Sequence, residues 1–343
     1  MSDTEVFSVA ADINSDSPAA GWDYFKVPLV DLGEAENQNF RGVWSPLPEV
    51  GAKKIGVDSV FLENAEDYYQ KYQGFDYWRM LTKQALSKLG IAEASLVVEF
   101  GCGFGNGTLP LLDLLPTARV IATDISPQLL SILKRLLDAR GLRTRCLPVA
   151  MDAQKDYLAE ACADLVFGSA ILHHLADPGA LVQCAMRILK PGGAAIFFEP
   201  FEAGNAILRL ICMLIAEEAD RRKVSSRAIK WVKAIPGTLE PQIKRHAVPG
   251  WSDFNDKWAF PRSVLESIAQ GAGAQLIVYP IHDNKGQFTR HFKYMLEVYG
   301  AMQAADLPEW AWRVLERFDQ ELFSPELLTD LLLEGCVIFR RPC

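Results

Sequence analysis

The chain has 343 residues, of which 50% are hydrophobic, enough to bury one large core or one core and a smaller lobe. Its formal net charge of −8 argues against a general nucleic-acid binder, which usually carries a basic excess. Seven scattered cysteines form no CxxC pair, which favours reduced thiols over a zinc site or a disulfide framework. The acidic N-terminus is unlike a signal peptide, and the longest apolar run is too short to span a bilayer. We therefore expect a cytoplasmic protein with neither a nucleic-acid nor a membrane partner.

The first 94 residues divide into two segments of different composition. Residues 1–60 are rich in Asp, Glu, Ser, Pro and Gly with little periodicity, which predicts an irregular arm. Residues 61–94 become helical in pattern and aromatic, from Tyr68 to Trp78. We expect this second segment to form cap helices that close over a bound ligand.

Between residues 95 and 202, short apolar runs alternate with amphipathic stretches. This alternation is typical of a parallel sheet covered by helices on both faces. Ser126 is expected to cap a helix over 127–140, because a serine side chain readily accepts from a backbone N–H group. A second helix is expected over 178–189. The predicted strands are 95–100, 119–123, 145–149, 163–168 and 194–198.

The alternation changes after residue 202. Residues 203–260 predict a helical lid insertion, and their aromatic side chains favour a partly apolar pocket beneath it. Residues 261–343 predict the rest of the core: a helix over 262–271, a strand over 274–281, and a helical insertion at 288–333. A final strand over 335–340 is expected to enter antiparallel at the sheet edge.

The most informative motif is the glycine-rich turn that follows the first core strand, Glu99-Phe-Gly-Cys-Gly-Phe-Gly105. Glycine is needed where backbone approaches a ligand closely or takes a positive φ. A carboxylate at Glu99 would repel a pyrophosphate, which disfavours a dinucleotide site but suits a cationic or hydroxyl-bearing ligand. Further acids end the next two strands, Asp124 and Asp152, and ligands bind at the carboxyl ends of such strands. A carboxylate at Asp124 suits two ribose hydroxyls, and one at Asp152 suits an adenine amino group.

In this order and spacing, the motifs resemble class I S-adenosylmethionine-dependent methyltransferases. Within that class they are most similar to the small-molecule enzymes of quinone, biotin and secondary-metabolite pathways. The resemblance covers about residues 95–200 and rests on the glycine turn, Ala122-Thr-Asp-Ile-Ser126, Met151-Asp-Ala153, the stretch 163–178, and Leu189-Lys-Pro-Gly-Gly193. It implies a doubly wound α/β fold: a mostly parallel, seven-stranded Rossmann-like sheet with an antiparallel last strand and an added helical lid.

The resemblance also implies the cofactor S-adenosyl-L-methionine, with S-adenosyl-L-homocysteine as product. Cofactor-binding positions follow residue by residue. The glycine turn meets the methionine part, Glu99 orients its amine, Asp124 holds the ribose, Asp152 and Ala153 meet the adenine, and Ser169 lies near the sulfonium. The full set of expected cofactor contacts is Glu99, Gly101, Gly103, Gly105, Asn106, Asp124, Ile125, Asp152, Ala153 and Ser169.

Methyl transfer to a hydroxyl also needs a base to remove the acceptor's proton. His174 is the favoured candidate, with His173 and Glu199 as alternatives, because all three follow the ends of predicted core strands. His246, His282 and His291 lie in the added segments and are weaker candidates. No metal site is expected, because adjacent histidines do not easily ligate one ion.

We therefore predict methylation of a partly apolar small molecule, with oxygen favoured as the acceptor atom and secondary or specialised metabolism as the setting. A nitrogen or carbon acceptor, an NAD(P)-dependent oxidoreductase, and a non-catalytic S-adenosylmethionine-binding protein stay open as alternatives. Aromatic side chains in the lid are compatible with a homodimer.

Overall fold

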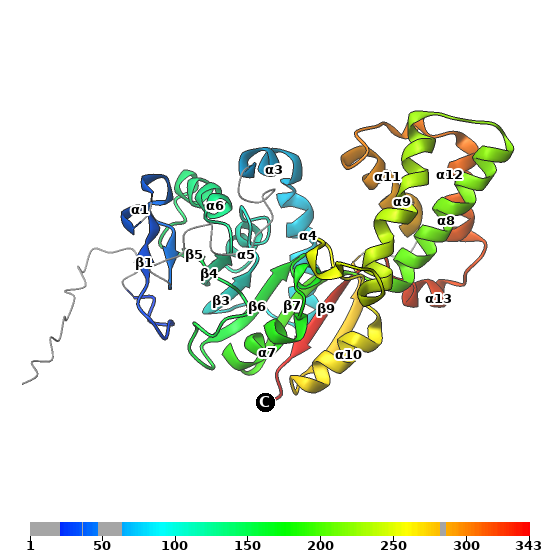
Figure 1. Cartoon of the computed structure of the whole chain (residues 1–343). Helices are drawn as coiled ribbons and strands as arrows, with labels where there is room; N and C mark the ends of the chain where they lie inside the picture. Colours follow the sequence, from blue (N-terminus) through cyan, green and yellow to red (C-terminus); the bar gives the residue numbers. More distant parts are fainter. Residues whose placement is uncertain (1–20, 36, 47–63, 282–285) are drawn as a thin grey trace, which may run out of the picture.

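The computed structural model describes residues 21–35, 37–46, 64–281 and 286–343. Its strands are β1 (Val30–Asp31), β2 (Trp44–Ser45), β3 (Leu96–Phe100), β4 (Arg119–Asp124), β5 (Cys146–Ala150), β6 (Ala163–Ser169), β7 (Leu189–Pro200), β8 (Gln275–Pro280) and β9 (Glu334–Arg340). In the described part of the chain they form a single sheet with the order β1-β2-β5-β4-β3-β6-β7-β9-β8 (Figure 1). The chain has an α/β fold, as predicted.

Two features of this sheet differ from the sequence prediction. It has nine strands instead of seven, because the N-terminal arm adds β1 and β2, each two residues long. The last strand, β9, is antiparallel as predicted but lies inside the sheet, between β7 and the edge strand β8. The inner position suits its sequence, because Gly335–Phe339 are all buried and need a neighbour on both sides.

Helices cover both faces of the central strands. One face carries α4 (Phe75–Leu89), α5 (Thr108–Leu114) and α6 (Pro127–Ala139), whose leucines share a core with Val97. The opposite face carries α7 (Pro178–Ile188) and α10 (Arg262–Gly271), which share a core with Val98 and Phe100. Successive side chains of a strand point to opposite faces, so Glu99 lies on the same face as Val97 and α5.

The described part of the N-terminal arm packs onto the core. Trp22 is buried, and the guanidinium of Arg119 lies 3.7 Å from the centre of a Trp22 ring. Lys26 pairs with Asp156 at 2.7 Å. The arm continues through a short helix, α1 (Leu32–Ala35), into β2. The rest of the predicted arm, residues 1–20 and 47–60, lies outside the described residues.

The helices added after β7 build a second hydrophobic core. They are α8 (Glu202–Arg221), α9 (Arg227–Lys244), α11 (Gln287–Val298), α12 (Glu309–Gln320) and α13 (Pro325–Asp330). Their buried side chains form one cluster, so the two predicted insertions make one helical subdomain, which lies to one side of the sheet in Figure 1. Whether the boundaries at residues 60, 94, 202 and 260 separate independent units stays a prediction.

None of the described helices is long and apolar enough to cross a membrane.

Candidate cofactor and catalytic site

The glycine turn between β3 and α5 leaves an open space above Gly103. The φ of Gly103 is 53°, in the left-handed region that favours glycine. A Cβ placed on Gly103 would meet only the Cδ1 atom of Leu129, at 4.0 Å, whereas one on Gly105 would collide with Leu133 at 2.6 Å. Gly103 therefore presents bare backbone to free space, and Gly105 allows α6 to pack against the turn.

Asp124 ends β4 and fastens that strand to the glycine turn. The N–H of Gly103 donates to its Oδ2 atom at 2.8 Å, and the N–H of Ser126 donates to Oδ1 at 2.8 Å. Burial raises the pKa of Asp124, while these backbone donors lower it. Ser126 caps α6 as predicted, accepting from the N–H of Leu129 at 3.2 Å. Each Asp124 oxygen has a second lone pair, so the carboxylate can still accept from a ligand hydroxyl.

Glu99 is buried beneath the glycine turn and the start of α5. Its Oε2 atom accepts from the hydroxyl of Thr108 at 2.5 Å, while Oε1 has no hydrogen-bond partner within the described structure. Burial raises the pKa of Glu99 to about 8; the Thr108 bond lowers it, and the nearby Asp124 charge raises it. A buried, unsatisfied carboxylate oxygen favours a ligand that brings a positive charge or a donor.

The other predicted cofactor positions follow the ends of neighbouring strands. Asp152 is half-buried just after β5, where its Oδ1 atom accepts from the N–H of Gln154 at 2.9 Å. Ala153 is half-buried beside it and packs against the core. Ile125 follows Asp124 directly, and Ser169 ends β6; both are half-buried. Their roles toward a cofactor stay predictions.

Asn106 has an interaction that the sequence did not suggest. Its Oδ1 atom accepts from the N–H of Gly74 at 3.0 Å, and its Nδ2 atom donates to the carbonyl of Tyr72 at 3.0 Å. These residues form the turn between α3 (Ala65–Tyr72) and α4. Asn106 therefore ties the cap helices to the glycine turn, and a direct cofactor contact stays a prediction.

Glu199, near the end of β7, holds the turn η2 (Leu172–His174) through four hydrogen bonds. Its Oε1 atom accepts from the N–H groups of Ile171 and Leu172 at 3.1 and 2.8 Å. Its Oε2 atom accepts from the N–H of His173 at 3.2 Å and lies 2.7 Å from His173 Nδ1. Because all four contacts are internal and the carboxylate is buried, Glu199 orients His173 better than it serves as a base.

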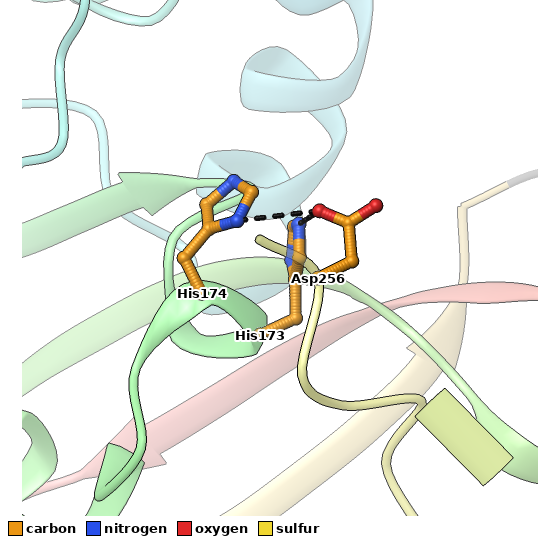
Figure 2. A group of neighbouring side chains, drawn as sticks. All are labelled: His173, His174 and Asp256. Atoms are coloured by element: carbon orange, nitrogen blue, oxygen red, sulfur yellow. Dashed lines mark ion pairs between the residues drawn. The ribbon is translucent and has the colours of Figure 1, made fainter. Parts of the chain in front are cut away.

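His173 and His174 converge on Asp256, which comes from the loop before α10 (Figure 2). The Oδ1 atom of Asp256 lies 3.7 Å from His173 Nε2 and 3.3 Å from His174 Nδ1. Burial lowers the pKa of His173, but Glu199 and Asp256 raise it more, so the net shift is upward. Burial and the neighbouring His173 lower the pKa of His174 to about 3, so its imidazole is neutral at pH 7 but only a weak base.

Aromatic side chains of three segments meet near these groups. Tyr68 and Tyr72 of α3 have ring centres 4.7 Å apart, and Tyr68 lies 6.0 Å from Phe104 of the glycine turn. Tyr299, at the end of α11, lies 6.4 Å from Tyr72. Burial and the charge of Asp124 raise the pKa of the Tyr68 phenol, which stays neutral. This aromatic cluster joins the cap helices to the helical subdomain.

Asp256 is the site residue that sequence reasoning missed. It lies in the Asn-Asp-Lys stretch between aromatic residues, and neither periodicity nor a motif marks it. Of the weaker histidine candidates, His246 packs against Trp251, with ring centres 4.1 Å apart, and His291 lies 3.9 Å from a Glu334 oxygen. His282 lies outside the described residues.

Comparisons with known proteins indicate a methyltransferase domain. Residues 98–197 match a family model described as a methyltransferase domain. A trans-aconitate 2-methyltransferase from Azoarcus sp. is 34% identical over 128 residues, which are 36% of this chain and 47% of the relative. A malonyl-[acyl-carrier protein] O-methyltransferase from Marinomonas sp. is 27% identical over 136 residues, 39% of this chain and 48% of the relative. The chain thus spans about half the length of these curated relatives.

Among solved structures, phosphoethanolamine N-methyltransferase 2 of Haemonchus contortus in complex with S-adenosyl-L-methionine is 16% identical. The match has a TM-score of 0.45 and covers 84% of this chain and 61% of that one.

The sheet, the glycine turn and the matched family model together define a methyltransferase core over residues 98–197. Residues 98–197 are thus similar to the methyltransferase domain of the class I S-adenosylmethionine-dependent enzymes, and S-adenosylmethionine is the cofactor of that class. The residues present fit it: Glu99 offers an unsatisfied oxygen for a cationic amine, Asp124 has acceptor capacity for a ribose, and Gly103 leaves room for the ligand.

Proposed function

We propose that the protein transfers the methyl group of S-adenosylmethionine to an oxygen atom of a small-molecule acceptor. The arrangement of Glu99, Gly103 and Asp124 around the end of β3 carries this proposal, because it brings together an acceptor for a cationic amine, open backbone that leaves room for a ligand, and an acceptor for hydroxyl groups. The matched family model supports the reaction class.

The reaction needs little from the protein beyond alignment and proton removal. The bound cofactor supplies a methyl group already activated on sulfur, so holding the acceptor in line provides most of the acceleration. One carbon–sulfur bond breaks, one carbon–oxygen bond forms, and a hydroxyl acceptor loses a proton. His174 accepts that proton in our proposal, because the Asp256 carboxylate, 3.3 Å from its Nδ1 atom, stabilises the imidazolium that forms and offsets the low pKa of the free imidazole. Glu199 acts through His173 as a positioning residue.

The acceptor is proposed to be partly apolar and to carry a hydroxyl or carboxylate. The cluster of Tyr68, Tyr72 and Tyr299 supports the apolar part, since aromatic faces recognise apolar groups. One relative supports oxygen over nitrogen, because it is a malonyl-[acyl-carrier protein] O-methyltransferase. A setting in specialised metabolism, a cytoplasmic location and the absence of nucleic-acid or membrane partners belong to the same proposal.

A homodimer is also part of the proposal. Within the described helices, α8 exposes the large apolar side chains of Leu210, Met213 and Leu214. Apolar surface of this kind is common where chains associate.

The test measures methyl transfer from labelled S-adenosylmethionine to a panel of hydroxyl compounds and carboxylic acids that carry apolar substituents. Amines form a separate arm of the panel. We expect labelled methyl ethers or esters. His174→Ala should lower kcat by about 100-fold at pH 7, with the matched variant His246→Ala near wild type. Transfer to amines alone would contradict the oxygen acceptor. Binding of S-adenosylmethionine with no transfer in any arm would favour a non-catalytic binding protein. Binding of NADH instead of S-adenosylmethionine would favour an oxidoreductase.

A further inference from the structure

His173, His174 and Asp256 form a compact group of metal-ligating side chains. One ligand atom from each lies within 4.8 Å of the other two. Of the separations to Asp256 Oδ1, that of His174 Nδ1, 3.3 Å, matches the spacing of about 3.3 Å expected between neighbouring ligands of a tetrahedral ion with bonds of about 2 Å, and that of His173 Nε2, 3.7 Å, exceeds it slightly. Adjacent histidines thus reach one point in space, because η2 turns the chain and Asp256 completes the set (Figure 2).

A second observation concerns the far side of His173. Its Nδ1 atom lies 2.7 Å from the buried carboxylate of Glu199, which fixes the ring and leaves Nε2 facing Asp256. A carboxylate behind a histidine that points its other nitrogen outward is the usual support of a metal-binding imidazole. The Asp256 side chain is 49% exposed, so an ion has a path from solvent.

We propose that His173, His174 and Asp256 bind a divalent first-row transition-metal ion, with Glu199 as the residue that orients His173. Two imidazole nitrogens and one carboxylate suit Zn²⁺ and its neighbours in the series, whereas Mg²⁺ prefers an all-oxygen site. Binding requires the Nδ1 atom of His174 to give up its hydrogen bond to the carbonyl of Asn255, now 3.0 Å long, for the ion.

Three protein ligands leave at least one coordination position for an outside oxygen. Under the proposed function, that position can hold a hydroxyl or carboxylate of the methyl acceptor. With the ion on Nδ1, the proton of the His174 imidazole lies on Nε2, so the ion takes over from His174 the task of promoting ionisation of a bound hydroxyl. This consequence rests on the proposed function, while the ion site itself does not.

The test titrates the full chain, freed of metal by a chelator, with Zn²⁺ in a calorimeter and with Co²⁺ in a visible spectrometer, without S-adenosylmethionine. We expect one Zn²⁺ per chain and Co²⁺ d–d bands of a four- or five-coordinate site. His174→Ala and Asp256→Asn should each weaken binding at least tenfold, and Glu199→Gln by about 10- to 100-fold. His291→Ala, which alters a histidine near another carboxylate, should bind like wild type.

Asp256→Asn keeps the size of a half-exposed side chain, so a thermal melt should confirm that this variant folds. Absence of saturable Zn²⁺ binding by wild type would overturn the proposal, as would equal affinity in Asp256→Asn and wild type. Because no step uses the cofactor, failure here leaves the methyltransferase proposal intact.

Discussion

The buried carboxylate of Glu199 lies 2.7 Å from Nδ1 of His173 and also accepts the backbone N–H of the same residue at 3.2 Å. The two contacts fix both the ring and the backbone of His173. Two further N–H groups, of Ile171 and Leu172, donate to the same carboxylate. One side chain at the end of β7 therefore positions the whole turn that presents the two histidines.

Glu199→Gln should destabilise the protein by about 2–4 kcal/mol, because an amide provides only one acceptor oxygen for these four donors and places N–H groups against N–H groups. Urea unfolding measures this loss, with Glu202→Gln, a partly exposed acid that pairs with Arg245 at 2.8 Å, as the matched control. An unfolding free energy like that of wild type would contradict the bonding pattern described above.

Glu99 should make stability fall as pH rises. Its folded pKa of about 8 exceeds its usual value of 4.5, so between these limits the folded state binds more protons than the unfolded state. Folding therefore weakens by about 1.4 kcal/mol per pH unit across this window. Glu99→Gln removes the titrating group, so its stability relative to wild type should increase from about pH 5 to about pH 8.

Urea unfolding of both proteins at several pH values checks this trend in Glu99. A difference between variant and wild type that stays constant with pH would show that Glu99 titrates near its usual pKa. The same carboxylate should favour a cationic ligand more strongly when ionised, so wild-type affinity for S-adenosylhomocysteine should rise from about pH 6 to about pH 8 by up to tenfold per unit.

Gly103 and Gly90 offer a matched pair. Both have positive φ, 53° and 68°, and in neither case does a Cβ meet an atom closer than 4.0 Å. Replacement by alanine should cost each about 1 kcal/mol of stability. Only Gly103→Ala should also weaken S-adenosylhomocysteine binding, by at least tenfold, because Gly90 ends α4 before β3 begins. Calorimetry measures the affinity of both variants for S-adenosylhomocysteine. Equal affinities of Gly103→Ala and Gly90→Ala would show that the cofactor binds elsewhere.

Asn106→Ala should loosen the cap helices. The variant loses the amide bonds to Gly74 and Tyr72, and a loss of about 1–3 kcal/mol follows from leaving those backbone groups without partners. Hydrogen exchange should quicken at the start of α4 while the strands stay protected. Unchanged exchange in α4, together with weaker cofactor binding, would instead support the direct cofactor contact that the sequence suggested.

Seven of the nine strands follow from the sequence, because each is a run of apolar residues bounded by turn signals. The two strands of the arm do not, since Val30–Asp31 and Trp44–Ser45 are too short to show a period. The position of β9 inside the sheet also escapes local patterning, because strand order is decided by which neighbours can cover the buried run Gly335–Phe339.

The proximity of Glu99 and Asp124 was predictable for a topological reason. Parallel strands place their carboxyl ends at one edge, so Glu99 and Asp124 come together whatever the loops do. The roles of Glu199 and Asp256 were not predictable. Both depend on contacts between segments that are far apart in the chain. Glu199 is 26 residues from His173, and Asp256 comes from a separate loop that reaches the histidine pair.

Binding of S-adenosylhomocysteine, measured by calorimetry, tests the central claim most directly. Asp124→Asn should weaken wild-type binding by about tenfold to a hundredfold, because the ribose loses a charged acceptor. Asp164→Asn is the matched control: that carboxylate also accepts two backbone N–H groups, those of Ser95 and Leu96, but at the opposite edge of the sheet. We predict micromolar binding by wild type, loss in Asp124→Asn and no change in Asp164→Asn. No binding by folded wild-type protein, or equal loss in both variants, would contradict a cofactor site at the ends of β3 and β4.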